Sequence, residues 1–117
     1  MQKHILLVDS DAASRSRLSQ ALLQREYRVS AACNCDQCLA LIDEDLPDCI
    51  IFDVELEGTS GTIMYSRLRR NSRTRDIPAI VCTDVGPRPV AFGTKAPVLP
   101  KSCTCEDLLH CVAAALA

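Results

Sequence analysis

The chain has 117 residues, a length that allows one domain with a single hydrophobic core. Apolar residues make up 48% of it and charged residues 24%, with a net charge of −2, so bulk charge gives no attraction for nucleic acid or an acidic membrane. No apolar stretch approaches the ~20 residues that span a bilayer. Strand-like sequence follows Met1–His4 directly, without a cleavable signal. We therefore expect one cytoplasmic domain over residues 1–117, with no nucleic-acid or membrane partner.

The first half of the chain predicts three strands separated by two helices. Residues 5–8 are all apolar, as in a strand covered on both faces. Asp11 is placed to cap the first helix, and Pro47 introduces the third strand. The expected strands cover residues 5–8, 27–32 and 49–52, and the expected helices cover 12–25 and 36–44.

The second half continues this alternation, with one irregular segment. Residues 84–95 contain two prolines and two glycines. Inside a helix a proline costs about 3 kcal/mol and a glycine about 1, so we expect the fourth helix to be shortened or missing. A turn signal at residues 58–61 and a capping box beginning at Thr104 introduce the helices on either side of it. The remaining expected elements are strands over 79–82 and 96–100, and helices over 62–70 and after Thr104.

Four polar residues each follow one of the apolar runs. They are Asp9, Asp53, Thr83 and Lys101. Strands that alternate with helices through short loops imply right-handed crossovers and a parallel sheet, so all four side chains are expected at one edge of it. Open α/β sheets bind their ligands at that edge. Two carboxylates, a hydroxyl and an ammonium would suit a divalent metal and a phosphoryl group.

This ordered set resembles the receiver domain of two-component response regulators, over essentially the whole chain. The resemblance implies an α/β, flavodoxin-like (βα)5 fold, a three-layer sandwich around a parallel five-stranded sheet in the order 2-1-3-4-5. The motifs that carry it are Ile5–Asp9, Pro47–Asp53, Gly58–Gly61, Ile77–Thr83, Lys101 and Asp107–Leu108.

By this resemblance Asp53 is the phosphoacceptor, and Mg²⁺ is held by Asp9, Asp53 and the backbone carbonyl of Glu55. A carboxylate is a competent nucleophile toward phosphorus, and Mg²⁺ prefers hard oxygen ligands. Lys101 would pair with the phosphoryl oxygen. The hydroxyl of Thr83 would turn toward it and bias the domain between two surface states.

The metal site departs from the family pattern at one position. The family has two adjacent acids after the first strand, and here the second is Ser10. A neutral hydroxyl replaces a charge, so Mg²⁺ binding is expected to be weak or lost. Asp11 is the alternative ligand, although its role as a helix cap explains it equally well.

The switch region departs in three places. Asp84 occupies a position where the family has a very small residue, and its carboxylate would repel an incoming dianion. Ser102 follows Lys101 where the family has proline, and Val98 replaces an aromatic switch residue. The surface that receivers use for dimers and partners is therefore altered.

Two functions follow. The first is a receiver that accepts a phosphoryl group on Asp53 from a histidine kinase or a phosphotransfer protein in a phosphorelay. Its output would be a changed interaction surface toward an unknown downstream protein or output domain, with homodimer formation open and no enzymatic turnover. The alternative is a pseudo-receiver that binds proteins without being phosphorylated.

A third, unrelated candidate is a metal or redox site built from cysteines. Cys33, Cys35 and Cys38 have ligand-like spacing, and Cys103, Cys105 and Cys111 form a second group. The inferred strand order puts the two groups at opposite edges of the sheet, so they could not share one ion. We expect reduced thiols, several of them buried in the core.

Overall fold

A computed structural model describes residues 2–84 and 96–117, and within them one parallel five-stranded sheet forms the centre of the molecule. The strand order is β2-β1-β3-β6-β7, which confirms the predicted 2-1-3-4-5 arrangement. The predicted loss of the fourth helix concerns residues 85–95, which lie outside the described part. The strands are β1 (His4–Val8), β2 (Arg28–Ala32), β3 (Cys49–Phe52), β6 (Ala79–Cys82) and β7 (Val98–Leu99).

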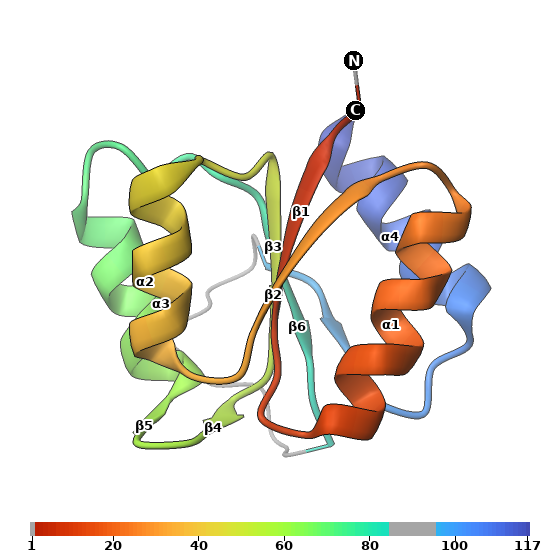
Figure 1. The fold of residues 1–117 in the computed structure, drawn as a ribbon, viewed down its shortest axis with the longest axis horizontal. Helices are drawn as coiled ribbons and strands as arrows, with labels where there is room; N and C mark the ends of the chain where they lie inside the picture. Colours follow the sequence, from red (N-terminus) through yellow and green to blue (C-terminus); the bar gives the residue numbers. More distant parts are fainter. Residues whose placement is uncertain (1, 85–95) are drawn as a thin grey trace.

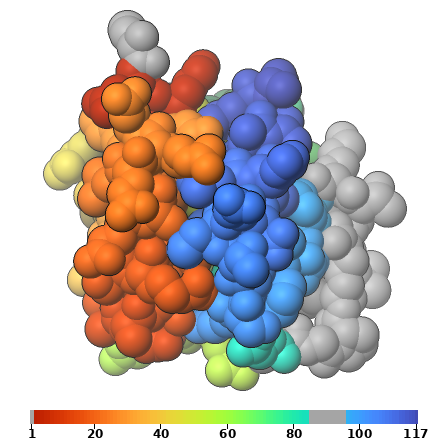
Figure 2. Space-filling model, turned by 90° about the vertical axis from the view of Figure 1, so that its right-hand side faces the viewer, coloured from red at the N-terminus to blue at the C-terminus, as the bar shows by residue number. Residues whose placement is uncertain are grey.

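Helices cover both faces of the sheet, as Figure 1 shows. α1 (Ala12–Gln24) and α4 (Cys105–Leu116) lie on one face, and α2 (Cys35–Glu44) and α3 (Gly61–Arg70) lie on the other. α1 and α4 pack side by side, which is visible from that face in Figure 2. No helix in the described ranges combines the length and the apolar character needed to cross a membrane.

Side-chain caps fix where the helices begin. Asp11 accepts a hydrogen bond from the backbone of Ala13, and Thr104 forms the predicted capping box with Asp107. Asn34 and Ser60 cap α2 and α3, so these helices begin one residue earlier than the sequence pattern indicated. Each cap satisfies backbone N–H groups that have no partner within the helix.

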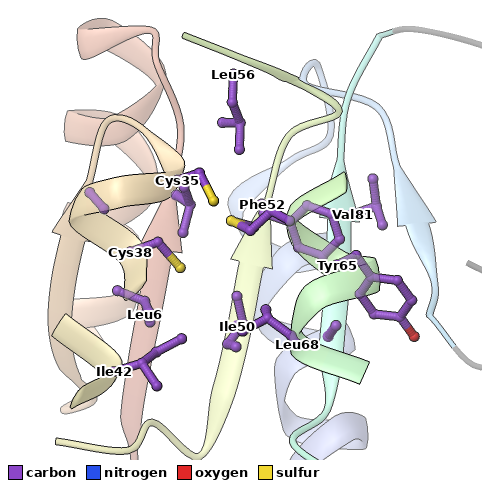
Figure 3. Packing of buried hydrophobic residues seen from close by; sticks show 14 of the residues in the cluster. Leu6, Cys35, Cys38, Ile42, Ile50, Phe52, Leu56, Tyr65, Leu68 and Val81 are labelled. Atoms are coloured by element: carbon purple, nitrogen blue, oxygen red, sulfur yellow. The ribbon is translucent and has the colours of Figure 1, made fainter. Parts of the chain in front are cut away.

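The strands divide the core into two layers because successive side chains point to opposite faces. Leu6, Val8, Ile50 and Phe52 face α2 and α3, and the residues between them face α1 and α4. In the first layer Phe52 stacks on Tyr65 with 5.7 Å between ring centroids (Figure 3). The central strands are buried along their whole length, as their continuous apolar runs predicted.

A small antiparallel hairpin follows β3 and was not predicted. β4 (Glu55–Leu56) pairs with β5 (Thr59–Ser60) through a turn in which Gly58 has φ of 81°. Two-residue strands are too short to produce an alternating pattern, so the sequence indicated only a turn here. The hairpin lies between the end of β3 and the start of α3.

The two cysteine groups are separated by the sheet itself. Cys35 and Cys38 belong to the layer under α2 and α3 (Figure 3), whereas Cys103 belongs to the layer under α1 and α4. The two groups were expected at opposite edges of the sheet. Because α4 packs over β3 and β6 in the middle of the sheet, the groups instead lie on its opposite faces. All eight cysteines are free thiols.

We predict that Gly61→Ala lowers the free energy of unfolding by about 2 kcal/mol or more. A Cβ atom at Gly61 would lie 2.0 Å from the backbone oxygen of Asp53, and backbone cannot move aside cheaply. Urea denaturation followed by circular dichroism measures the change. Gly58→Ala is the matched control: its Cβ would meet nothing within 4 Å, so only the strain of its positive φ, about 1 kcal/mol, applies. Equal losses in the two variants would contradict the close approach.

Candidate functional site at the carboxyl edge of the sheet

The four predicted polar residues do meet at one edge, because neighbouring strands end in register. Val8 pairs with Phe52, so Asp9 and Asp53 follow adjacent strands at the same level. The backbone N–H of Asp53 donates to Val8, and that of Thr83 donates to Leu99. Lys101 follows β7, the next strand along. The placement predicted from the sequence is thus observed for all four.

An ammonium group joins the two carboxylates. Lys101 Nζ lies 2.6 Å from Asp53 Oδ2 and 3.1 Å from Asp9 Oδ1. The Asp9 and Asp53 side chains are 2% and 5% exposed, and the lysine side chain is 20% exposed. Two buried like charges would repel each other strongly without a cation between them. Lys101 therefore holds this edge of the sheet together.

The charge state of Lys101 follows from this pairing. Burial disfavours its charged form, but the hydrogen bonds and charges of Asp53 and Asp9 outweigh burial and raise the pKa of Lys101 above its usual value. A raised lysine pKa means that the stabilisation is fully present at neutral pH. It is lost only when the pH rises through that raised value.

The backbone around Asp53 is tightly fixed. Its Oδ1 accepts a hydrogen bond from the N–H of Glu55 at 3.2 Å, which orients the carboxylate. Gly61 donates its N–H to the carbonyl of Val54 at 2.6 Å, and its Cα lies against the Asp53 main chain. Only glycine fits there, so the start of α3 is built directly on the residue that carries the carboxylate.

The oxygens near Asp9 and Asp53 define what the site could hold. The Ser10 hydroxyl lies 3.4 Å from the carbonyl of Glu55, so two neutral oxygens accompany the two carboxylates. Asp11 is engaged elsewhere, because its Oδ1 accepts from Ala13 and its Oδ2 from the hydroxyl of Ser14. Among residues 2–84 and 96–117, no cluster of three or more His, Cys, Asp and Glu side chains is arranged to hold a metal.

The structure adds a hydrogen bond of Asp84 that was not predicted, while its expected repulsion of the phosphodonor stays a prediction. Its Oδ1 accepts the backbone N–H of Lys101 at 2.9 Å, so this carboxylate oxygen binds protein backbone at the mouth of the site. The acceptor role depends on a contact 17 residues away in sequence, and no local pattern could have indicated it.

Two arginines of α1 also reach the site and were missed by the sequence analysis. Arg15 donates to the carbonyl of Asp9 at 2.8 Å, and Arg17 donates to the carbonyl of Lys101 at 2.6 Å. A helical segment with scattered arginines is normally a solvated surface, so nothing in the sequence distinguished these two.

The fold and this edge define a doubly wound α/β domain with an acidic pair and a lysine at the carboxyl ends of its strands, and comparison with known proteins gives its family. The response regulator receiver domain family matches residues 5–110. The chain belongs to this family: it is a receiver domain of two-component response regulators, a signalling domain.

Individual relatives agree. The chain is 40% identical over 84 residues to the phosphate regulon transcriptional regulatory protein PhoB of Pseudomonas aeruginosa, covering 72% of this chain and 37% of PhoB. It is 38% identical over 84 residues to the response regulator PleD of Caulobacter vibrioides, covering 71% of this chain and 18% of PleD. These matches therefore cover well under half the length of each relative.

A solved structure matches along its full length. A putative response regulator from Chloroflexus aurantiacus superposes with a TM-score of 0.91 and 28% sequence identity, covering 99% of this chain and 98% of that one. The likeness extends over nearly the whole of both chains, which supports the receiver fold described above.

We predict that Lys101→Met lowers the free energy of unfolding at pH 7 by about 2 kcal/mol, because two buried carboxylates lose their cation. Chemical denaturation measures the change. Lys3→Met is the matched control, since Lys3 is exposed and lies at the other end of β1. A loss no larger than in this control would show that the pair of carboxylates does not depend on Lys101.

Proposed function

We propose that Asp53 is the phosphoacceptor of this receiver and that Asp9, Thr83 and Lys101 serve the transfer. The observation that carries the proposal is the ammonium of Lys101 at 2.6 Å from Asp53 and 3.1 Å from Asp9. A pseudo-receiver that only binds proteins needs no lysine held between two buried carboxylates. The family assignment supports the same reading.

In the proposed reaction a carboxylate oxygen of Asp53 attacks the phosphorus of a phosphohistidine on a histidine kinase or a phosphotransfer protein. The new P–O bond forms as the P–N bond breaks, and the product is an acyl phosphate on Asp53 and a free histidine on the donor. The transition state spreads negative charge over three oxygens, so positioning and charge neutralisation supply most of the catalysis. Lys101 is placed to neutralise that charge, and Thr83 lies buried directly after β6, at the same edge of the sheet.

The oxygens at this edge fit Mg²⁺. Asp9, Asp53, the Glu55 carbonyl and the Ser10 hydroxyl are all hard ligands, and Ser10 and Glu55 already lie close together. Asp11 is left out because the cap of α1 occupies both of its oxygens. When bound, Mg²⁺ would neutralise charge on the phosphoryl oxygens. With a hydroxyl in place of a third carboxylate, its affinity is expected to be low.

The partners follow from the same proposal. The donor is a histidine kinase or a phosphotransfer protein, and the signal passes to a downstream protein or an output domain through a changed surface. Val98 lies on β7, where the family pattern places an aromatic switch residue, so any change at Thr83 must reach that surface without a moving ring.

We predict that the protein, incubated with Mg²⁺ and a small acyl phosphate, gains the mass of one phosphoryl group on Asp53. Intact mass spectrometry measures the adduct. Asp53→Asn should abolish it, whereas Asp43→Asn, an exposed carboxylate on α2, should leave it unchanged. A folded protein that forms no adduct at millimolar Mg²⁺, and also none with beryllofluoride, would favour the pseudo-receiver.

We also predict that Ser10→Asp tightens Mg²⁺ binding about tenfold by restoring a charge to the site. Backbone amide shifts on Mg²⁺ titration measure the affinity. Asp11→Ser separates the two candidate ligands, because serine caps a helix as well as aspartate does but supplies no carboxylate. The affinity of Asp11→Ser should match that of the unmodified protein, and a clear loss would make Asp11 a ligand after all.

A further inference from the structure

Both polar groups of the Lys101 main chain, its N–H and its carbonyl, form hydrogen bonds with charged side chains from other parts of the chain. Its N–H donates to Asp84 Oδ1 at 2.9 Å, and its carbonyl accepts from Arg17 Nη2 at 2.6 Å. Arg17 reaches a second carbonyl in the same segment, that of Cys103, at 3.4 Å. Figure 2 shows the chain leading into α4 lying against α1, the helix that carries Arg17.

The local sequence explains why the backbone of Lys101 needs these hydrogen bonds. Ser102 follows Lys101, and serine leaves the backbone free to rotate, whereas a proline at this position would restrict it. A lysine side chain has four rotatable bonds, so its ammonium is placed accurately only if its Cα is held firmly. Without that support, the ammonium would not stay between Asp9 and Asp53.

The side chains of Arg17 and Asp84 are chemically suited to hold the backbone of Lys101. A guanidinium is planar and presents several donors, so Arg17 can bind two carbonyls that lie two residues apart in the same turn, those of Lys101 and Cys103. The hydrogen bond from Lys101 to Asp84 is charge-assisted, which makes it stronger than a neutral one. Arg15, two residues before Arg17 on α1, donates to the carbonyl of Asp9 in the same way, so α1 supports both sides of the ion pair.

We infer that Arg17 and Asp84 are positioning residues that clamp the backbone of Lys101 and so aim its ammonium at the phosphoryl group on Asp53. The inference rests on the function proposed above and deepens it. It also gives Asp84 a role opposite to simple repulsion of the phosphodonor: its oxygen acts as a hydrogen-bond acceptor for Lys101.

Two variants of Asp84 separate the two roles. Asp84→Asn removes the charge but keeps an acceptor oxygen, whereas Asp84→Ala removes both. If the clamp operates, Asp84→Ala slows phosphorylation by a small acyl phosphate about tenfold, as expected for a misplaced catalytic group, and Asp84→Asn stays near the original rate. Equal acceleration in both variants would mean that the carboxylate only repels the donor, and would overturn the clamp.

Arg17 is tested in the same assay. Arg17→Met should slow phosphorylation about tenfold, and Arg17→Lys should recover part of the rate because it keeps the charge and one donor nitrogen. Arg70→Met, which changes an exposed arginine at the far end of α3, is the control for general loss of positive charge.

In a Lys101→Met background neither Arg17→Met nor Asp84→Ala should slow the reaction further, because both act through Lys101. Additive losses in that background would overturn the inference.

A measurement without phosphate keeps the clamp distinguishable from the proposed function. Hydrogen exchange of the Lys101 amide, followed by NMR in the unphosphorylated protein, should speed up at least about tenfold in Asp84→Ala and much less in Asp84→Asn, because the asparagine oxygen still accepts the N–H. Unchanged exchange in Asp84→Ala sinks the clamp even if Asp53 is phosphorylated normally. Failure of the unmodified protein to take up phosphate, with exchange behaving as expected, would sink the proposed function alone.

Discussion

Two carboxylates buried side by side at the ends of neighbouring strands are the constraint around which this domain is organised. The parallel register of β1 and β3 brings Asp9 and Asp53 together, and a single ammonium from beyond β7 compensates both. Neither charge could stay buried alone, so the edge of the sheet is stable only while Lys101 remains in place. The same arrangement suits the transfer of a negatively charged phosphoryl group, because the ammonium of Lys101 is already positioned between the two carboxylates.

Much of this could be predicted from the sequence, because the relevant signals are local. Four apolar runs, each followed by a polar residue, predict four of the five strands and place Asp9 and Asp53 at one edge of a parallel sheet. The strand order itself came from the resemblance to receiver domains. Capping residues such as Asp11 and Thr104 mark helix starts to within a residue. These features need only a few neighbouring residues to be recognised.

The parts that could not be predicted depend on contacts between distant segments. Arg15 and Arg17 look like solvent-exposed helix residues until the fold places the carbonyls of Asp9 and Lys101 within their reach. For Asp84 the sequence indicated only a charge, because its hydrogen bond from Lys101 joins residues 17 positions apart. The hairpin after β3 escaped notice because its strands are shorter than any repeat in the sequence can reveal.

The thiols buried in the sheet have a practical consequence of their own. Desolvation raises the pKa of Cys49 and of Cys82 to about 12, and Cys38 behaves in the same way. At neutral pH these thiols are almost entirely protonated, so alkylating reagents react with them negligibly while the sheet is closed. Exposed Cys105, in contrast, is open to the same reagents. The rate at which the protected thiols become labelled therefore reports how often the strands separate, without any engineered probe.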